Sequence, residues 1–238
     1  MISLLLPELV QLQDTRVHTG LDVARLTQLE NDHGITLPEE HKTVLQWSNG
    51  LEFYAGYIRL FGLYTAQSID AVGWNEPECW KFAWADRCSG YWCFGETAWG
   101  DQYAYSMKEW RKGGRAGVYL LDALSMTPQI VASSFVEFLE DELVPSARNP
   151  HDDLLIQARQ RFGPLEVSSH LAYIPSVLLG GIEDINNVQV MNARAAMICN
   201  GDVAIQLDSA PSQVAVKGVQ SYVDELQRTR LRLVWMED

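Results

Sequence analysis

The sequence predicts an α+β fold: a mainly antiparallel sheet flanked by helices, followed by a smaller α+β domain. Three observations support this class. Residues 21–50 have the caps and periodicity of two helices, short strands follow as far as residue 132, and a further helix begins at Ser133 or Ser134. Helices, then a run of strands, then a helix favour antiparallel pairing over the alternating order of a parallel sheet.

The charge of the chain indicates which kinds of partner it could bind. The chain has 238 residues, of which 47% are apolar, so it can bury a sizeable core. It carries 31 acidic and 18 basic residues, a net charge of −13. Phosphate backbones are repelled by such a surface, so we expect no direct nucleic-acid binding. A basic protein partner would be attracted, although an acidic surface also serves solubility alone.

Two helices are predicted before the strands. The first follows a cap at Thr19, has an acid in its first turn and ends at Gly34. The second has Pro38 in its first turn, followed by two glutamates near the positive end of the helix dipole. It stops at Asn49-Gly50, where glycine permits a left-handed conformation. Together they make a helix pair joined by a short loop.

The strands are predicted from aromatic and apolar residues without helix caps. Residues 91–96 and 102–107 should form a hairpin, since residues 98–101 include the glycine that a tight reversal needs. Residues 66–90 have no clear assignment, because Pro77 interrupts any long helix. Further strands are expected over residues 57–64, 117–121 and 129–132.

The segment 145–150, with a proline at each end, is the best domain boundary. We therefore expect one α+β domain over residues 1–146 and a smaller one over residues 151–238. In the second domain, a helix is expected over residues 152–162 and a terminal hairpin from residues 214–223 and 229–235. Residues 195–199 and 203–207 are either two strands around an Asn-Gly-Asp turn, or the second of them is helical.

Residues 20–143 resemble the SUKH superfamily, which includes yeast cell-wall assembly regulator-like domains. The opening signature is matched by Leu29-Glu30 and then Gly34-Ile-Thr-Leu-Pro-Glu-Glu-His-Lys-Thr-Val-Leu-Gln-Trp-Ser-Asn-Gly. Gly100-Asp101-Gln102-Tyr103 matches the later hairpin, and Ser134-Phe-Val-Glu-Phe-Leu matches the closing helix. The resemblance implies a bent sheet flanked by helices. Its commonest implied role in bacteria is immunity, the binding and neutralising of a toxin from neighbouring cells.

The second half is similar to the C-terminal domain of type VI secretion immunity proteins. The similarity lies in Phe162-Gly-Pro-Leu and in Ala172-Tyr-Ile-Pro-Ser-Val-Leu-Leu-Gly-Gly. Residues 197–207 depart from that pattern, because Asn200-Gly201-Asp202 stands where an unbroken helix is expected. Both resemblances imply an immunity protein. With the net charge of −13 and no catalytic constellation in the sequence, they predict a cytoplasmic, non-catalytic protein that occludes a basic protein toxin, with a nuclease as one candidate. A regulatory scaffold for an endogenous partner is the alternative.

Candidate partner-binding residues combine aromatic rings with carboxylates. Trp99 lies at the predicted turn between Glu96 and Asp101, and Asp101 could instead bond backbone groups of its turn. The other candidates flank Pro77, where acids stand beside aromatic rings in a predicted loop; a plain solvated loop explains them equally well. These candidates are Trp74, Glu76 and Glu78. Most tryptophans between Trp74 and Trp110 should fill the sheet core.

Catalysis and metal binding are weakly supported. Cys88 or Cys93 with His33 or His41 could pair a nucleophile with a base, but a small buried thiol explains a strand cysteine more simply. The four cysteines show no CxxC pair, so we expect no metal and no cofactor. The basic loop 111–115 lacks P-loop spacing. The N-terminal segment lacks the basic region of a signal peptide, and no apolar run has the ~20 residues of a membrane helix. A remote alternative is a small-molecule-binding protein or a hydrolase.

Overall fold

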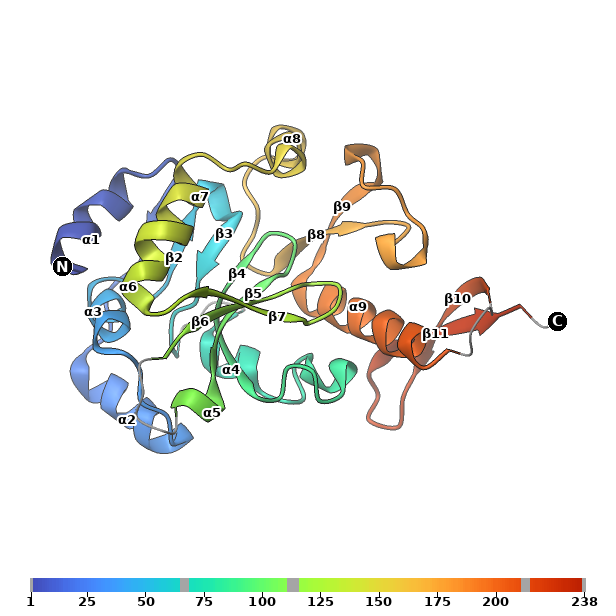
Figure 1. Cartoon of the computed structure of the whole chain (residues 1–238), viewed down its shortest axis with the longest axis horizontal. Coiled ribbons are helices and arrows are strands. Elements are labelled where there is room, and N and C mark those ends of the chain that lie inside the picture. Colours follow the sequence, from blue (N-terminus) through green and yellow to red (C-terminus); the bar gives the residue numbers. More distant parts are fainter. Residues whose placement is uncertain (1, 65–68, 111–115, 211–214, 237–238) are drawn as a thin grey trace.

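The computed structural model describes residues 2–64, 69–110, 116–210 and 215–236 (Figure 1). Its centre is a seven-stranded antiparallel sheet in which every strand pairs with its neighbours in the sequence. Helices flank this sheet, so the predicted α+β class is confirmed. The strands are β1 (Arg16–Val17), β2 (Leu51–Phe53), β3 (Ile58–Leu60), β4 (Tyr91–Thr97), β5 (Gln102–Ser106), β6 (Val118–Leu121) and β7 (Pro128–Ala132).

Three helices precede most of the sheet: α1 (Ile2–Gln11), α2 (Val23–His33) and α3 (Glu39–Trp47). Asp22, and not Thr19, caps α2, because its carboxylate accepts the backbone N–H of Arg25 at 2.8 Å. Gly34 ends α2 with φ +61°, as the sequence predicted. At the end of α3 the Asn49 side chain exchanges two hydrogen bonds with the backbone of Leu63. These two hydrogen bonds occupy the backbone N–H and carbonyl of Leu63, which therefore do not pair with a neighbouring strand. The predicted strand 57–64 is accordingly shorter in the structure, where β3 spans Ile58–Leu60.

The described part of the stretch that the sequence left unassigned, residues 69–90, packs against β4 of the sheet. It holds α4 (Ala71–Asn75), capped by Asp70, and the short 3-10 helix η2 (Lys81–Trp84). Another single turn, α5 (Met107–Trp110), follows the β4–β5 hairpin. The Asn75 side chain donates to the Cys93 carbonyl and accepts the Cys93 N–H, which attaches α4 to β4.

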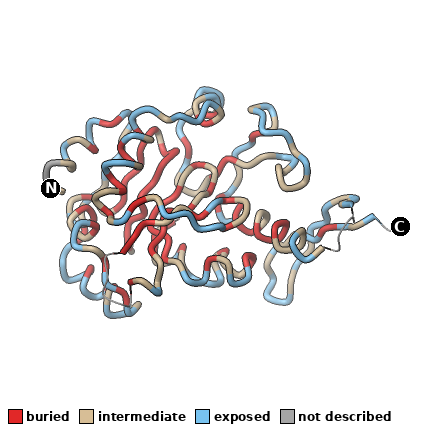
Figure 2. The backbone as a smooth tube through the Cα atoms, viewed as in Figure 1, coloured by how far each residue is buried: buried red, intermediate tan, exposed pale blue. Residues whose placement is uncertain are grey.

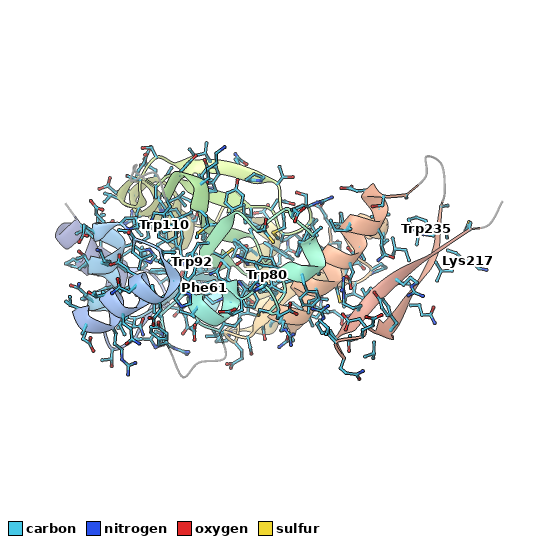
Figure 3. All side chains as sticks on the ribbon, turned by 90° about the horizontal axis from the view of Figure 1, so that it is seen from below. Phe61, Trp80, Trp92, Trp110, Lys217 and Trp235 are labelled. Carbon is cyan, nitrogen blue, oxygen red and sulfur yellow. The ribbon has the colours of Figure 1, made fainter. Side chains whose placement is uncertain are left out.

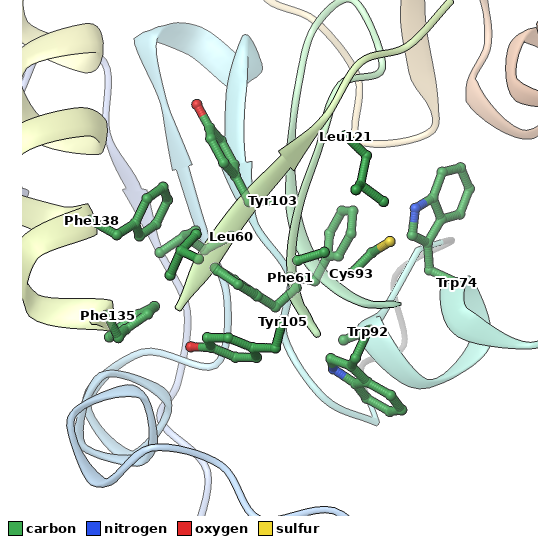
Figure 4. Close-up of a cluster of buried hydrophobic side chains, with 14 of the residues drawn as sticks. Leu60, Phe61, Trp74, Trp92, Cys93, Tyr103, Tyr105, Leu121, Phe135 and Phe138 are labelled. Carbon is green, nitrogen blue, oxygen red and sulfur yellow. The ribbon is translucent and has the colours of Figure 1, made fainter. Parts of the chain in front are cut away.

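A continuous helical segment follows the last strand of the seven-stranded sheet and packs against the sheet. It is built from α6 (Phe135–Glu137), the π-helical segment η3 (Phe138–Leu143) and α7 (Val144–Arg148), and Ser134 caps its start. Phe135 and Phe138 point from this run toward Tyr103 and Tyr105 of β5 (Figure 4). Phe138 lies 4.8 Å from the Tyr103 ring, measured between centroids, in an edge-biased packing typical of aromatic cores.

The second half adds two small sheets and two helices to this core. The sequence predicted α8 (Asp153–Phe162) and the hairpin of β10 (Val216–Val223) with β11 (Thr229–Trp235). The other elements are β8 (Ser169–Tyr173), the 3-10 turns η4 (Val177–Leu179) and η5 (Ile185–Asn187), β9 (Val188–Asn192) and α9 (Ala193–Asp208).

Helix α9 corrects the two-strand interpretation of residues 195–207. The Asn-Gly-Asp triplet lies inside the helix, where it supplies contacts that a turn would not need. Gly201 faces the backbone of Ala83, and Asp202 is buried and paired with Arg230 of β11. Residue 201 is therefore glycine because the Ala83 backbone leaves no room for a Cβ, and residue 202 is aspartate because it pairs with Arg230 inside the protein.

The two halves share their interior. Buried residues gather in the seven-stranded sheet and along the first part of α9 (Figure 2). The Trp84 indole donates to the Met197 carbonyl at 3.0 Å, which joins η2 to α9. The β10–β11 hairpin projects from this body, and Figure 3 shows Trp235 and Lys217 far from Trp92 and Trp110.

Candidate partner-binding site

A pocket of about 380 Å³ lies beside the turn between β4 and β5, where the second half of the chain meets the sheet. Its walls come from segments far apart in the sequence: the turn itself, the loop after β6, the start of α8, the end of β8 and the segment after η4. Gly100 makes this meeting possible. It has φ +93°, and a Cβ at its position would lie 2.9 Å from the His170 ring nitrogen Nδ1. Glycine therefore lets β8 approach the turn closely.

One wall of the pocket is a pair of aromatic rings. Trp99 and Tyr173 stack with centroids 5.0 Å apart and an angle of 4° between their planes. The Trp99 indole N–H donates to a carboxylate oxygen of Asp152 at 2.7 Å. The other oxygen of Asp152 caps α8 by accepting the backbone N–H groups of Leu154 and Leu155. A helix cap, an indole and a strand tyrosine thereby hold one another in place.

Four carboxyl groups line the same pocket: Asp101, Asp122, Asp152 and Glu183. Asp101 accepts the Thr97 hydroxyl at 2.7 Å and the Ala123 backbone N–H at 2.9 Å. Burial raises the pKa of Asp101 above its ordinary value, and the charge of Asp122 adds to that effect. Burial also raises the pKa of Tyr173 to about 12, with Glu183 and Asp152 contributing. None of the described residues that line the pocket is basic.

Comparison with known proteins identifies the first half. The SMI1 / KNR4 family (SUKH-1) matches residues 20–141, just over half of the chain. The chain belongs to the SMI1 / KNR4 family. Among solved structures, a crystal structure of Atu4351 from Agrobacterium tumefaciens is similar, with a TM-score of 0.54 and 12% identity. That likeness covers 98% of this chain and 97% of the other, and at this identity it shows a shared fold alone. No curated protein matches the chain.

The SUKH-1 region supplies only part of the pocket. Trp99, Asp101 and Asp122 lie within residues 20–141, whereas Asp152, Tyr173 and Glu183 come from beyond it. The pocket therefore combines the SUKH-1 sheet with the second half of the chain. The architecture of both halves recurs in the Atu4351 structure, which the likeness spans almost completely.

Of the six candidate residues, the structure brings only Trp99 and Asp101 together at this pocket. Trp74 and Glu96 are buried in the core and do not line this pocket, so neither is exposed for direct contact with a partner. The Trp74 indole donates to the Gln102 side chain at 2.7 Å, inside the SUKH-1 core. Glu96 is fully enclosed between Arg59 and His170. A charged residue in this strand marks a buried ion pair, which the sequence pattern did not distinguish from a solvated carboxylate.

Glu76 and Glu78 are exposed, as expected, but neither of them lines this pocket. The Glu78 carboxylate pairs with Arg228, near the β10–β11 turn, at 2.6 Å, and its backbone carbonyl accepts from Arg194 of α9. Their role in partner binding remains a prediction. Asp122, Asp152, Tyr173 and Glu183 were not singled out from the sequence. Only the acidic start of α8 gave a local signal, and that signal indicated a helix cap.

The cysteine–histidine pairs considered for catalysis lie in unreactive surroundings. Burial raises the pKa of the Cys88 thiol to about 11 and that of Cys93 to about 12. The thiolate is the nucleophile, so such thiols are poorly prepared to attack. Burial lowers the pKa of His41 to about 3, and its ring bonds the Tyr105 hydroxyl at 3.0 Å. His33 packs edge-on against Trp92.

Three other features considered from the sequence are a metal site, a membrane-spanning helix and the basic segment 111–115. Within the described residues, no group of three His, Cys, Asp or Glu side chains is arranged to hold a metal ion. No helix in the same part of the chain is long and apolar enough to cross a membrane. The basic segment 111–115 lies outside the described residues.

Proposed function

We propose that this protein is a non-catalytic immunity protein that binds a basic protein toxin and neutralises it by covering its active site. The observation that carries the proposal is the acidic and aromatic pocket that the SUKH-1 region forms together with the second half of the chain. Resemblance to the SUKH superfamily implies immunity as the commonest bacterial role. Similarity of the second half to type VI secretion immunity proteins points to the same role.

The physical basis of binding would be an aromatic anchor surrounded by negative charge. Large aromatic side chains are frequent hot spots of protein interfaces, and charges around them steer association. The whole molecule carries a net charge of −13, so a cationic toxin would be drawn toward it before contact. A nuclease is one such toxin, since it must attract phosphate backbones.

The surroundings of the thiols support binding without catalysis. Cys88 and Cys93 are buried with raised pKa values, and the His41 ring is enclosed by Phe94 and Phe135. All four cysteines are free, which suits the reducing cytoplasm in which such a protein would meet its toxin.

Co-expression with the product of a neighbouring toxin-like gene tests the proposal. We expect the toxin to lose its lethality and the two proteins to elute together in gel filtration. The association rate should fall steeply as salt is raised, because steering between opposite charges is screened. Continued lethality with no complex in gel filtration would refute the proposal. Turnover of a small substrate by the isolated protein would refute its non-catalytic part.

A further inference from the structure

We propose that the pocket beside the β4–β5 turn binds one arginine side chain of the protein partner, with the guanidinium placed against Trp99 and Tyr173 and among the carboxylates. The identity of the partner rests on the proposed function above. The arginine preference rests on the pocket itself, and it can be tested without the toxin.

The size and walls of the pocket suit one long side chain. Its volume of about 380 Å³ lies near the lower end of the range of small-ligand sites, about 300–1,000 Å³. Leucine side chains and the two aromatic rings provide apolar contact for a hydrocarbon stem. A guanidinium is planar and weakly hydrated, so it stacks on aromatic faces at a smaller desolvation cost than an ammonium.

The carboxylates of the pocket are not paired with a cation from the described part of the chain. Asp101, Asp122, Asp152 and Glu183 form no ion pair with any described residue, whereas other carboxylates, such as Glu52, Glu96 and Asp202, pair with arginines. The three aspartates accept hydrogen bonds from neutral N–H and O–H donors. Four acids around one hollow therefore create a negative potential that a cation from outside would neutralise. The raised pKa of Asp101 reflects burial together with repulsion from Asp122.

Arginine fits better than the other cations. A metal ion needs several carboxylate oxygens turned toward one point, and no such group exists among the described residues. Asp101 and Asp152 already accept two and three hydrogen bonds that hold the turn and the helix cap, which leaves single acceptor sites for N–H donors but not the ligand set of a metal ion. An arginine fork donates up to five hydrogen bonds in fixed directions and can reach separate acceptors around a rim, whereas a lysine acts as a point charge.

A titration of the isolated full-length chain tests this inference. The probes are N-acetyl-arginine amide, the neutral isostere N-acetyl-citrulline amide and N-acetyl-lysine amide. The readout is the NMR signal of the Trp99 indole N–H, assigned by its loss in Trp99→Phe. We expect a saturable shift with the arginine probe, at least fivefold weaker binding of the lysine probe and no shift with citrulline. Equal responses to arginine and citrulline, or no response of Trp99 to arginine, would overturn the inference.

Two variants test the carboxylates without removing the fold. Asp152→Asn keeps the helix cap, because asparagine caps about as well as aspartate, but it removes the acceptor of the Trp99 indole N–H, so it tests the charge and that hydrogen bond together. Glu183 is exposed, so Glu183→Gln should leave the packing intact. Each should weaken arginine binding at least fivefold. The control Glu140→Gln removes the same charge from an exposed helical position that does not line the pocket, and its affinity should stay within twofold.

The same variants separate this inference from the proposed function. If the toxin is found, Asp152→Asn and Glu183→Gln should each weaken the complex at least tenfold, while Glu140→Gln should not. A toxin complex that is indifferent to both pocket variants would overturn the arginine site and leave immunity standing. Specific arginine binding with no toxin partner would uphold the site and reject immunity.

Discussion

Arg59 is the residue that ties the second half of the chain to the sheet. Its side chain is buried on β3, donates to the backbone carbonyls of Glu166, Val167 and Ser169, and pairs with Glu96 at 3.0 Å. Glu96 also meets His170 at 2.9 Å. Burial raises the pKa of Glu96, but the charges of Arg59 and His170 outweigh it and hold that pKa below its ordinary value. One buried cation therefore positions the strand that forms a wall of the pocket.

Glu96→Gln should destabilise the protein strongly. The substitution removes the counter-charge of a buried guanidinium, and breaking such a pair typically costs about 3–5 kcal/mol. Urea unfolding followed by tryptophan fluorescence measures the change. Glu140→Gln, at an exposed position, should stay within about 0.5 kcal/mol of the parent. A similarly small effect at Glu96 would show that the ion pair does not hold the fold together.

His41 should make the protein less stable as the pH falls. Burial keeps its ring neutral down to a pKa of about 3, whereas in the unfolded chain it takes up a proton below its ordinary value of 6.5. Acid therefore favours the unfolded state between these two values, by at most about 1.4 kcal/mol for each pH unit. His41→Gln should reduce the slope of unfolding free energy against pH between 6.5 and 5. His151→Gln, at an exposed site, should leave that slope unchanged.

For single residues, the sequence predicted the burial of aromatic side chains better than it predicted which charged side chains pair with each other. Most tryptophans between Trp74 and Trp110 are buried, as the usual burial of aromatic rings predicted, and Trp99 is only partly buried, as its place at a glycine turn suggested. The burial of Glu96 did not follow, because its partners Arg59 and His170 are distant in the sequence. For the same reason, nothing local joined Asp152 and Tyr173 to Trp99.

Among the elements, helix α9 shows how packing overrides local preference. Asn-Gly-Asp is a common turn sequence, and glycine lowers the stability of an isolated helix. In the structure the triplet instead packs against η2 and β11, where a Cβ on Gly201 would lie 2.8 Å from the Ala83 carbonyl oxygen. The β4–β5 hairpin is the opposite case. Its strands, turn and glycine all agree locally, and it formed where the sequence predicted.

Gly201→Ala should destabilise the protein although alanine is the best helix former. The added methyl group would press on the backbone of Ala83, which cannot move aside as a flexible side chain could, and overpacking costs about 1–3 kcal/mol. Gly73→Ala in α4 is the matched control, because its new Cβ would meet only the Asp70 side chain, at 3.9 Å. The control should be neutral or stabilise by up to about 1 kcal/mol. Thermal unfolding of both variants compares them, and equal gains would contradict the packing argument.

For the whole molecule, the predicted division at residues 145–150 does not separate the interior. One apolar cluster joins the seven-stranded sheet to Ala193, Met197 and Ile198 of α9. A second cluster joins Tyr54 and Tyr57 to residues of α8 and of the β8–β9 hairpin. A charged side chain also links the two halves, because Arg59 of β3 donates hydrogen bonds to backbone carbonyls within residues 166–169. The two-domain description remains a prediction. Because the two halves share their interior, we expect the first half to be less stable when it is expressed without the second.

A fragment of residues 1–149 should be markedly less stable than the full chain. Removing the rest leaves buried Arg59 without its carbonyl partners, Glu96 without His170 and the Trp84 indole without the Met197 carbonyl. These losses should lower the free energy of unfolding by at least about 3 kcal/mol and expose apolar surface that binds a hydrophobic dye. Urea unfolding and dye fluorescence of the fragment and the full chain measure both effects. A fragment that unfolds cooperatively at the same urea concentration as the full chain would instead establish two independent domains, and the pocket would then lie between units free to separate.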